Sequence, residues 1–115
     1  MTEGDVVIVA LRQADGKIKN RPALLLRIFP LPYQDCLLCG ISTQLNQCIN
    51  NFDEIIGRSD TDFVSSGVIT ESLIRLSFLA AVPQKQIIGT IGVLSKERHE
   101  RLLKKLSQYI TANVD

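Results

Sequence analysis

Three cysteines are the first residues whose spacing could do chemistry. Cys36 and Cys39 form a Cys-Leu-Leu-Cys segment, which superficially matches the CxxC pattern of metal and redox sites. The segment reads as a buried strand, where residues three apart point to opposite faces, so the two thiols would diverge instead of binding one ion. We expect Cys36, Cys39 and Cys48 to be reduced structural residues, with no metal and no cofactor.

Other familiar catalytic patterns find little support in the sequence. The single histidine, His99, lies in a charged C-terminal stretch, far in sequence from other candidate catalytic residues, so a histidine-based mechanism is not favoured. Ser72 has no apparent histidine or lysine base, and we expect it to be a structural hydrogen-bonding residue. The chain has no HExxH, P-loop or GxGxxG motif, which argues against metalloproteases, NTPases and dinucleotide-binding enzymes.

Length and charge limit the remaining possibilities. The 115 residues, 45% of them hydrophobic, suit a single domain over residues 1–115. Because the formal net charge is only +1, any contact with a nucleic acid must come from a local cluster of basic side chains. The acidic start lacks the basic region of a secretory signal, and no apolar run reaches the ~20 residues of a spanning helix. We therefore expect a cytoplasmic protein that does not contact a membrane.

Short β-branched and apolar runs alternate with turn signals along most of the chain. Asp15-Gly16 marks a turn, and Pro30 and Pro32 close an apolar run. The patterns predict strands at 6–11, 22–29, 36–41, 52–56, 72–76 and 89–94, polar loops at 12–20 and 42–51, and a helical turn or loop at 61–66.

The C-terminal segment has helical periodicity. Ser95 can cap a helix that runs to about Asn113. An apolar stripe is expected to pack on the sheet: Leu102, Leu103, Leu106, Tyr109 and Ile110. The charged positions are expected to form a solvated face: Glu97, Arg98, Glu100, Arg101, Lys104 and Lys105. The fold class is thus mainly β with a C-terminal α-helix, a small bent sheet or barrel that the helix covers.

Four local patterns occur in an order that resembles the MazF/PemK toxins. They are Gly4-Asp5 before the first strand, Arg21-Pro22 opening the second, Ile41-Ser42-Thr43-Gln44 ending the third, and a tail from Ser72-Leu73-Ile74-Arg75-Leu76 through Gly92-Val93-Leu94-Ser95. The resemblance spans residues 4–95 and implies an SH3-like small β-barrel. It also implies the toxin component of a type II toxin-antitoxin system, a metal-independent endoribonuclease that cleaves single-stranded RNA in a sequence-specific way.

The resemblance implies Arg21 and Ser42 as the catalytic pair. The family usually has threonine at the second position, so serine keeps the hydroxyl but loses the methyl that restricts its rotamer. In the family the 2′-OH attacks its own phosphate and leaves a 2′,3′-cyclic phosphate and a 5′-OH. Arginine's permanent charge and planar fork suit the phosphoryl oxygens, which assigns Arg21 to electrostatic stabilisation, with Ser42 donating a hydrogen bond. The general base stays open, because Asp15 is the only carboxylate in the loop before Arg21.

Four more residues are candidates for RNA binding. Thr43 and Gln44 would orient the backbone or the substrate, and Lys17 and Lys19 could form a phosphate-binding rim. Simpler explanations remain for both groups, since hydroxyl residues often satisfy backbone groups at strand ends and loop lysines are usually only solvated.

The resemblance also implies protein partners. A homodimer is expected because the family's barrels pair, and because the apolar segments 24–26 and 37–38 could leave apolar surface to bury. A cognate antitoxin is expected to place a disordered C-terminal segment near Arg21 and to fold on binding. Two alternatives stay open: a non-catalytic barrel similar to the CcdB toxins that inhibit DNA gyrase, and a degenerate member that only binds an antitoxin or DNA.

Overall fold

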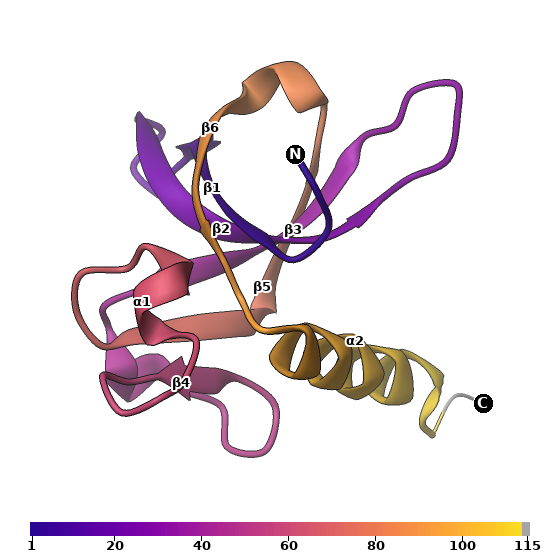
Figure 1. Cartoon of the computed structure of the whole chain (residues 1–115). Coiled ribbons are helices and arrows are strands. Elements are labelled where there is room, and N and C mark those ends of the chain that lie inside the picture. Colours follow the sequence, from indigo (N-terminus) through magenta and orange to yellow (C-terminus); the bar gives the residue numbers. More distant parts are fainter. Residues whose placement is uncertain (114–115) are drawn as a thin grey trace.

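The computed structural model describes residues 1–113, in which one antiparallel sheet curls into a half-open barrel (Figure 1). The strand order is β4-β5-β3-β2-β1-β6. The strands are β1 (Asp5–Arg12), β2 (Ile18–Ile28), β3 (Cys36–Ser42), β4 (Glu54–Ile56), β5 (Ser72–Val82) and β6 (Ile87–Val93). The helices are α1 (Phe63–Ser66) and α2 (Lys96–Thr111), and two 3₁₀ turns are η1 (Leu45–Gln47) and η2 (Gln84–Gln86). The predicted fold class, mainly β with a C-terminal helix, is confirmed.

The sheet buries apolar side chains on both faces, because it curls over one face and carries α2 on the other. One cluster includes Leu24, Leu26 and Cys39 with Leu102 of α2, and a second includes Leu25 and Cys36. Each fully buried aliphatic side chain contributes about 1.5–3 kcal/mol. Cys36 and Cys39 thus point into different clusters, and all three cysteines are free, so the prediction of divergent structural thiols is confirmed.

Two strands are longer than the sequence predicts. β2 begins at Ile18, so the last three residues of the predicted loop 12–20 belong to a strand, with Asn20 opposite Ala10 of β1. The side chains of 17–21 are exposed and, apart from Ile18, polar, so no apolar alternation marks this pairing. β5 continues to Val82, beyond the predicted end at Leu76. The prediction ends too early because an irregularity in the register of β5 interrupts the alternation of buried and exposed residues.

Helix α2 begins as predicted, but its faces are partly different. The Oγ of Ser95 accepts a hydrogen bond from the backbone N–H of Arg98 at 3.2 Å, which confirms the N-cap. Leu102 and Leu106 are buried, whereas Tyr109 is 69% exposed, as its end of the helix extends beyond the sheet (Figure 1). The apolar stripe therefore packs on the sheet only along its first part, and exposed Ile110 lies outside it.

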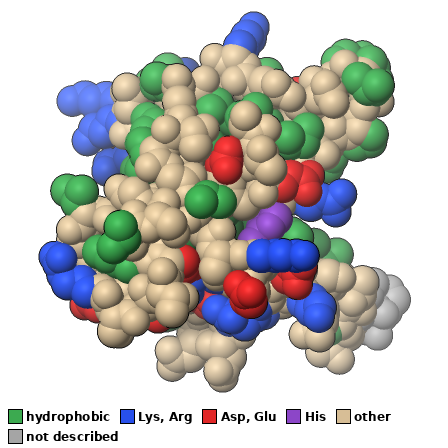
Figure 2. All heavy atoms as spheres, in the orientation of Figure 1, with side chains coloured by type: hydrophobic (Ala, Val, Ile, Leu, Met, Phe, Trp, Pro, Cys, Tyr) green, Lys and Arg blue, Asp and Glu red, His purple; other side chains and the backbone are tan. Residues whose placement is uncertain are grey.

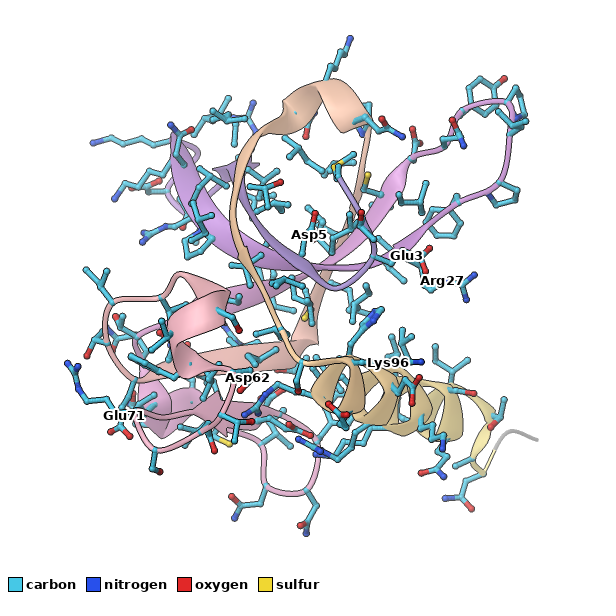
Figure 3. The ribbon with its side chains drawn as sticks, in the orientation of Figure 1. Glu3, Asp5, Arg27, Asp62, Glu71 and Lys96 are labelled. Carbon is cyan, nitrogen blue, oxygen red and sulfur yellow. The ribbon has the colours of Figure 1, made fainter. Side chains whose placement is uncertain are left out.

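Arg98 does not belong to a solvated face, which corrects the expectation for that position. Its side chain is only 8% exposed. Its Nε donates to Asp62 Oδ2 at 2.8 Å and its Nη1 donates to Glu54 Oε1 at 2.9 Å. In Figure 3 Asp62 lies beside the first turn of α2, where the backbone N–H of Ser95 also donates to it at 3.1 Å. These contacts attach the start of α2 to β4 and to the segment before α1.

Contacts with basic side chains of α2 hold both carboxylates, Glu54 and Asp62, in their charged form. Burial disfavours the charge of Glu54, but hydrogen bonds from Arg101 and Lys105 outweigh it and lower the pKa of Glu54 to about 2. Burial also opposes ionisation of Asp62, and the hydrogen bonds from Arg98 and Ser95 lower its pKa below the ordinary value.

Two further features bear on partners. The segments expected to supply apolar surface are largely buried, since Leu24, Leu25 and Leu26 are inaccessible and Leu38 is 1% exposed. That reason for a homodimer is therefore wrong.

Among the described residues, no helix is long and apolar enough to cross a membrane.

Candidate active site

A groove of about 560 Å³ opens where the β1–β2 hairpin meets the end of β3 and the start of β5. The loop that leaves β3 forms one wall, and the end of β1 forms another. The polar residues of its lining include Arg12, Arg21, Ser42, Thr43, Gln44 and Arg75. Segments that are far apart in the sequence thus meet at one concave surface.

The pairing of β2 with β3 brings Arg21 and Ser42 to this groove. Ala23 lies opposite Gly40 in the antiparallel ladder. Arg21 precedes Ala23 by two residues and Ser42 follows Gly40 by two, so the same register directs both side chains to the same region of the sheet. Arg21 is exposed, as a contact with a ligand requires, and both residues line the groove.

The hydroxyl of Ser42 has a local hydrogen bond. The backbone N–H of Gln44 donates to Ser42 Oγ at 3.0 Å, which is the turn interaction typical of serine at a strand end. The oxygen acts as the acceptor, so its own proton remains available to a ligand oxygen. The turn fixes where the oxygen lies and is compatible with a role in binding.

The four candidates for RNA binding fall into two groups. Thr43 and Gln44 are exposed and line the groove. Lys17 and Lys19 are exposed further along the β1–β2 hairpin, outside the residues that line it. Figure 2 shows basic side chains gathered over this hairpin, so the lysines extend the positive surface beyond the groove.

Two arginines in the groove were not among the candidates. Arg12 ends β1, and its Nη1 donates to the carbonyl of Gly16 at 2.8 Å within the hairpin. Arg75 lies in β5 opposite Gly40. A charged side chain between the buried Ile74 and Leu76 was the available signal for Arg75, but only the sheet pairing shows which site it faces.

The charge of the groove differs sharply from that of the whole chain. Three arginines line it, and within the described residues no aspartate or glutamate does. The chain as a whole has a formal net charge of +1. A local concentration of positive charge of this kind attracts anionic ligands, above all those with several phosphates.

Other candidate groups have structural contacts. Ser72 is buried and its Oγ donates to the carbonyl of Thr70 at 2.9 Å, which confirms the expected structural role. His99 Nε2 lies 2.9 Å from the carbonyl oxygen of Leu26, away from the groove lining. Burial raises the pKa of the Cys39 thiol, so it is not a reactive thiolate. The described part of the chain contains no cluster of three or more His, Cys, Asp or Glu suited to a metal ion.

Comparisons with known proteins agree with the fold and with the resemblance of the motifs. Residues 2–110 match the family described as PemK-like, MazF-like toxin of type II toxin-antitoxin system. A search of curated proteins found no significant match. The solved structure of Mycobacterium tuberculosis toxin MazF-mt6 is similar in fold, with a TM-score of 0.68 and 16% sequence identity over 96% of this chain and 99% of that chain. Because the family match extends over nearly the whole chain, this protein belongs to the PemK-like, MazF-like toxins of type II toxin-antitoxin systems.

Proposed function

We propose that this toxin is an endoribonuclease that cleaves single-stranded RNA without a metal ion, in the groove that contains Arg21 and Ser42. The observation that carries the proposal is the lining of that groove, which combines three arginines with hydroxyl and amide side chains and, among the described residues, no carboxylate. Such a lining suits a phosphodiester backbone. Membership of the family supports the same activity.

The proposed reaction uses a nucleophile that RNA itself supplies. The 2′-oxygen attacks the adjacent phosphorus, the bond from phosphorus to the 5′-oxygen breaks, and the products end in a 2′,3′-cyclic phosphate and a 5′-OH. Negative charge builds on the phosphoryl oxygens during the attack. Arg21 would stabilise this charge with its planar fork, and the free proton of Ser42 would hydrogen-bond a phosphoryl oxygen or the leaving oxygen.

The proton transfers are assigned to solvent. The described lining has neither a carboxylate nor an imidazole, and arginine stays protonated at working pH. In the proposal the 2′-OH therefore loses its proton to water, and the departing 5′-oxygen takes a proton from water. Thr43 and Gln44 would position the strand.

The nature of the products tests this proposal. Purified protein is incubated with a long single-stranded RNA in EDTA, and the fragment ends are mapped. We expect 5′-OH and 2′,3′-cyclic phosphate ends, and no cleavage where the attacking nucleotide is replaced by its 2′-deoxy form. Intact RNA would refute the activity, and inhibition of DNA gyrase by the same preparation would support the CcdB-like alternative.

We further propose an antitoxin whose C-terminal segment covers the groove near Arg21. An acidic segment would complement the three arginines of the lining, and a disordered segment can wrap around such a site as it folds. We place the toxin in the cytoplasm, where the RNA substrate is found. Co-expression with the neighbouring small gene should relieve the growth arrest that the toxin causes. Unchanged toxicity would contradict this partner.

We also propose that the toxin is a homodimer, for a different reason from the one that the sequence suggested. Exposed aliphatic side chains lie on and near the edge strand β6: Val64, Ile69, Ile88, Ile91 and Val93. An edge strand with apolar neighbours is a ready surface for a second copy. Sedimentation at tens of micromolar should give a dimer, and a monomer would count against it.

A further inference from the structure

The loop that joins β3 to β4, residues 43–53, forms one wall of the groove (Figure 1). Three of its side chains line the groove: Thr43, Gln44 and Gln47. The structure describes every residue of this loop, and Asp53 is the one that is buried, with 5% exposure. Phe52 is half-buried and packs toward α2, where its ring lies 5.2 Å from that of Tyr109. A carboxylate is thus the one fully buried side chain in a largely exposed loop.

Donors from two segments meet at the carboxylate of Asp53. The backbone N–H of Ile49 donates to Oδ2 at 3.0 Å, and the N–H of Asp53 donates back to the carbonyl of Ile49 at 2.9 Å. On the other side, the backbone N–H of Ser77 donates to Oδ1 at 3.1 Å. The Ser77 hydroxyl lies 3.2 Å and 3.1 Å from the two oxygens. One side chain therefore closes the end of the loop and joins it to β5.

Ser77 has a free backbone donor because β5 bulges at this point. The register between β3 and β5 is irregular here, and residues 76–78 have no partner on β3. Arg75 and Phe78, which lie on either side of this segment's centre, line the groove. Asp53 thus connects two walls of the groove, the loop after β3 and the bulge of β5.

A carboxylate suits this position better than an amide does. Both of its oxygens accept from backbone N–H groups, whereas either orientation of an asparagine would turn its NH₂ group toward one of these donors. Among the described residues, no basic side chain lies within 4.0 Å of Asp53, so hydrogen bonds alone compensate its burial. A buried carboxylate without a counterion is costly, and its place beneath the groove wall points to a role in holding the site.

We propose that Asp53 is a positioning residue, which fixes the loop so that the hydroxyl of Ser42 keeps its place in the groove. The backbone N–H of Gln44 donates to Ser42 Oγ at 3.0 Å, so the orientation of this hydroxyl depends on the loop that Asp53 anchors. The effect on cleavage rests on the proposed function, whereas the anchoring rests on the geometry. Asp53 is outside the groove lining and does not touch the substrate.

The test compares two carboxylates that are about equally buried. Asp53→Asn keeps the shape of the side chain and loses one acceptor. Asp62→Asn is the matched control, because Asp62 is 4% exposed and also accepts from a backbone N–H, that of Ser95, but lies outside the groove. Ser77→Ala removes the hydroxyl and keeps the backbone hydrogen bond to Asp53. Arg58→Ala, also outside the groove lining, shows the effect of a neutral surface change.

Each variant is examined by single-turnover cleavage at saturating RNA and by amide hydrogen exchange, under conditions where urea unfolding shows it to be folded. Asp53→Asn should cleave about 10–100-fold more slowly, because a displacement of about 1 Å at a reacting group has an effect of this size. Ser77→Ala should fall between Asp53→Asn and wild type. Asp62→Asn should be less stable than wild type and cleave at the wild-type rate.

Hydrogen exchange reports on the loop without any need for activity. The amides of Gln44, Gln47 and Cys48 donate within the loop region. In Asp53→Asn they should exchange about tenfold faster or more, while the amides of β2 keep their wild-type rates, because only the loop opens more often. Asp62→Asn should leave the exchange of these three amides unchanged.

The possible outcomes separate this inference from the proposed function. A wild-type cleavage rate in folded Asp53→Asn would overturn the positioning role. Faster exchange throughout the chain, or an equal loss of rate in Asp62→Asn, would overturn it in favour of a general loss of stability. If wild type does not cleave RNA, the nuclease is refuted by itself. Faster exchange confined to the loop would then still support the anchoring by Asp53, and unchanged exchange would overturn it.

Discussion

The buried ion pairs of Arg98 provide a quantitative test of how α2 is attached. Arg98→Leu removes the cation that faces Asp62, which is 4% exposed, and Glu54, whose side chain is 10% exposed. Removing one partner of a buried pair costs about 3–5 kcal/mol, because the remaining charge is buried without compensation. That is a large part of the roughly 5–15 kcal/mol by which a domain of this size is stable.

The control is an arginine that binds the same carboxylate from the surface. Arg101 is 51% exposed and donates to Glu54 at 2.8 Å. Arg101→Ala should therefore cost at most about 1 kcal/mol, as exposed ion pairs do. The double variant Arg98→Leu/Asp62→Ala should lose less than the sum of its single variants, because the two side chains interact directly.

Urea unfolding followed by far-UV circular dichroism measures these differences, since the chain has no tryptophan. The pKa of Glu54 falls from 4.5 to about 2 on folding, so its contribution is complete at neutral pH and is lost as pH falls through that range. Asp62 has the same sign. Because hydrogen bonds from Arg98 lower the pKa of Asp62, wild type and Arg98→Leu should converge as acid protonates Asp62, whereas Glu54 keeps Arg101 and Lys105 in both proteins. A loss below about 1 kcal/mol at pH 7, or a difference that does not depend on pH, would refute the reasoning.

Three other changes give separate tests. Ser42→Ala should slow cleavage, whereas Ser42→Thr should keep or raise it in single-turnover assays; a faster Ser42→Ala would be contrary evidence. Gly67→Ala should lower the free energy of unfolding in urea by about 2 kcal/mol or more, because φ is +79° and a Cβ would collide with the β6 backbone. Gly16→Ala, with φ +84° but open space around the Cβ, should lower it by only about 1 kcal/mol. Cys36→Ser with Cys39→Ser should lower stability and leave the cleavage rate of the folded protein intact.

Local signals were sufficient for much of the fold. Alternating apolar residues located the strands, and Ser95 located the start of α2, because side-chain period and capping depend on neighbours in sequence. The motif around Arg21 and the segment that begins at Ser42 predicted two groups of residues that the structure brings to one groove. Their catalytic roles stay predictions.

Features that depend on distant pairing could not be read from the sequence. Arg98 occupies a polar helical position by periodicity, and its burial depends on Asp62 and Glu54, which precede it by more than thirty residues. Arg75 reaches the groove because β5 pairs with β3 through a bulge, and nothing local specifies that register. Arg12 lies in a predicted loop whose pairing was hidden by polar side chains.

The most direct test of the central claim is the single-turnover cleavage rate of Arg21→Ala in EDTA, at saturating RNA. The account predicts a rate lower by roughly 10²–10³, the usual effect of losing one preorganised donor, with a much smaller loss of RNA binding. Arg21→Lys should restore the rate only in part, since a point charge cannot reproduce a two-pronged contact, and Arg58→Ala should match wild type. Near-wild-type cleavage by Arg21→Ala, or a requirement for a divalent metal, would contradict the account.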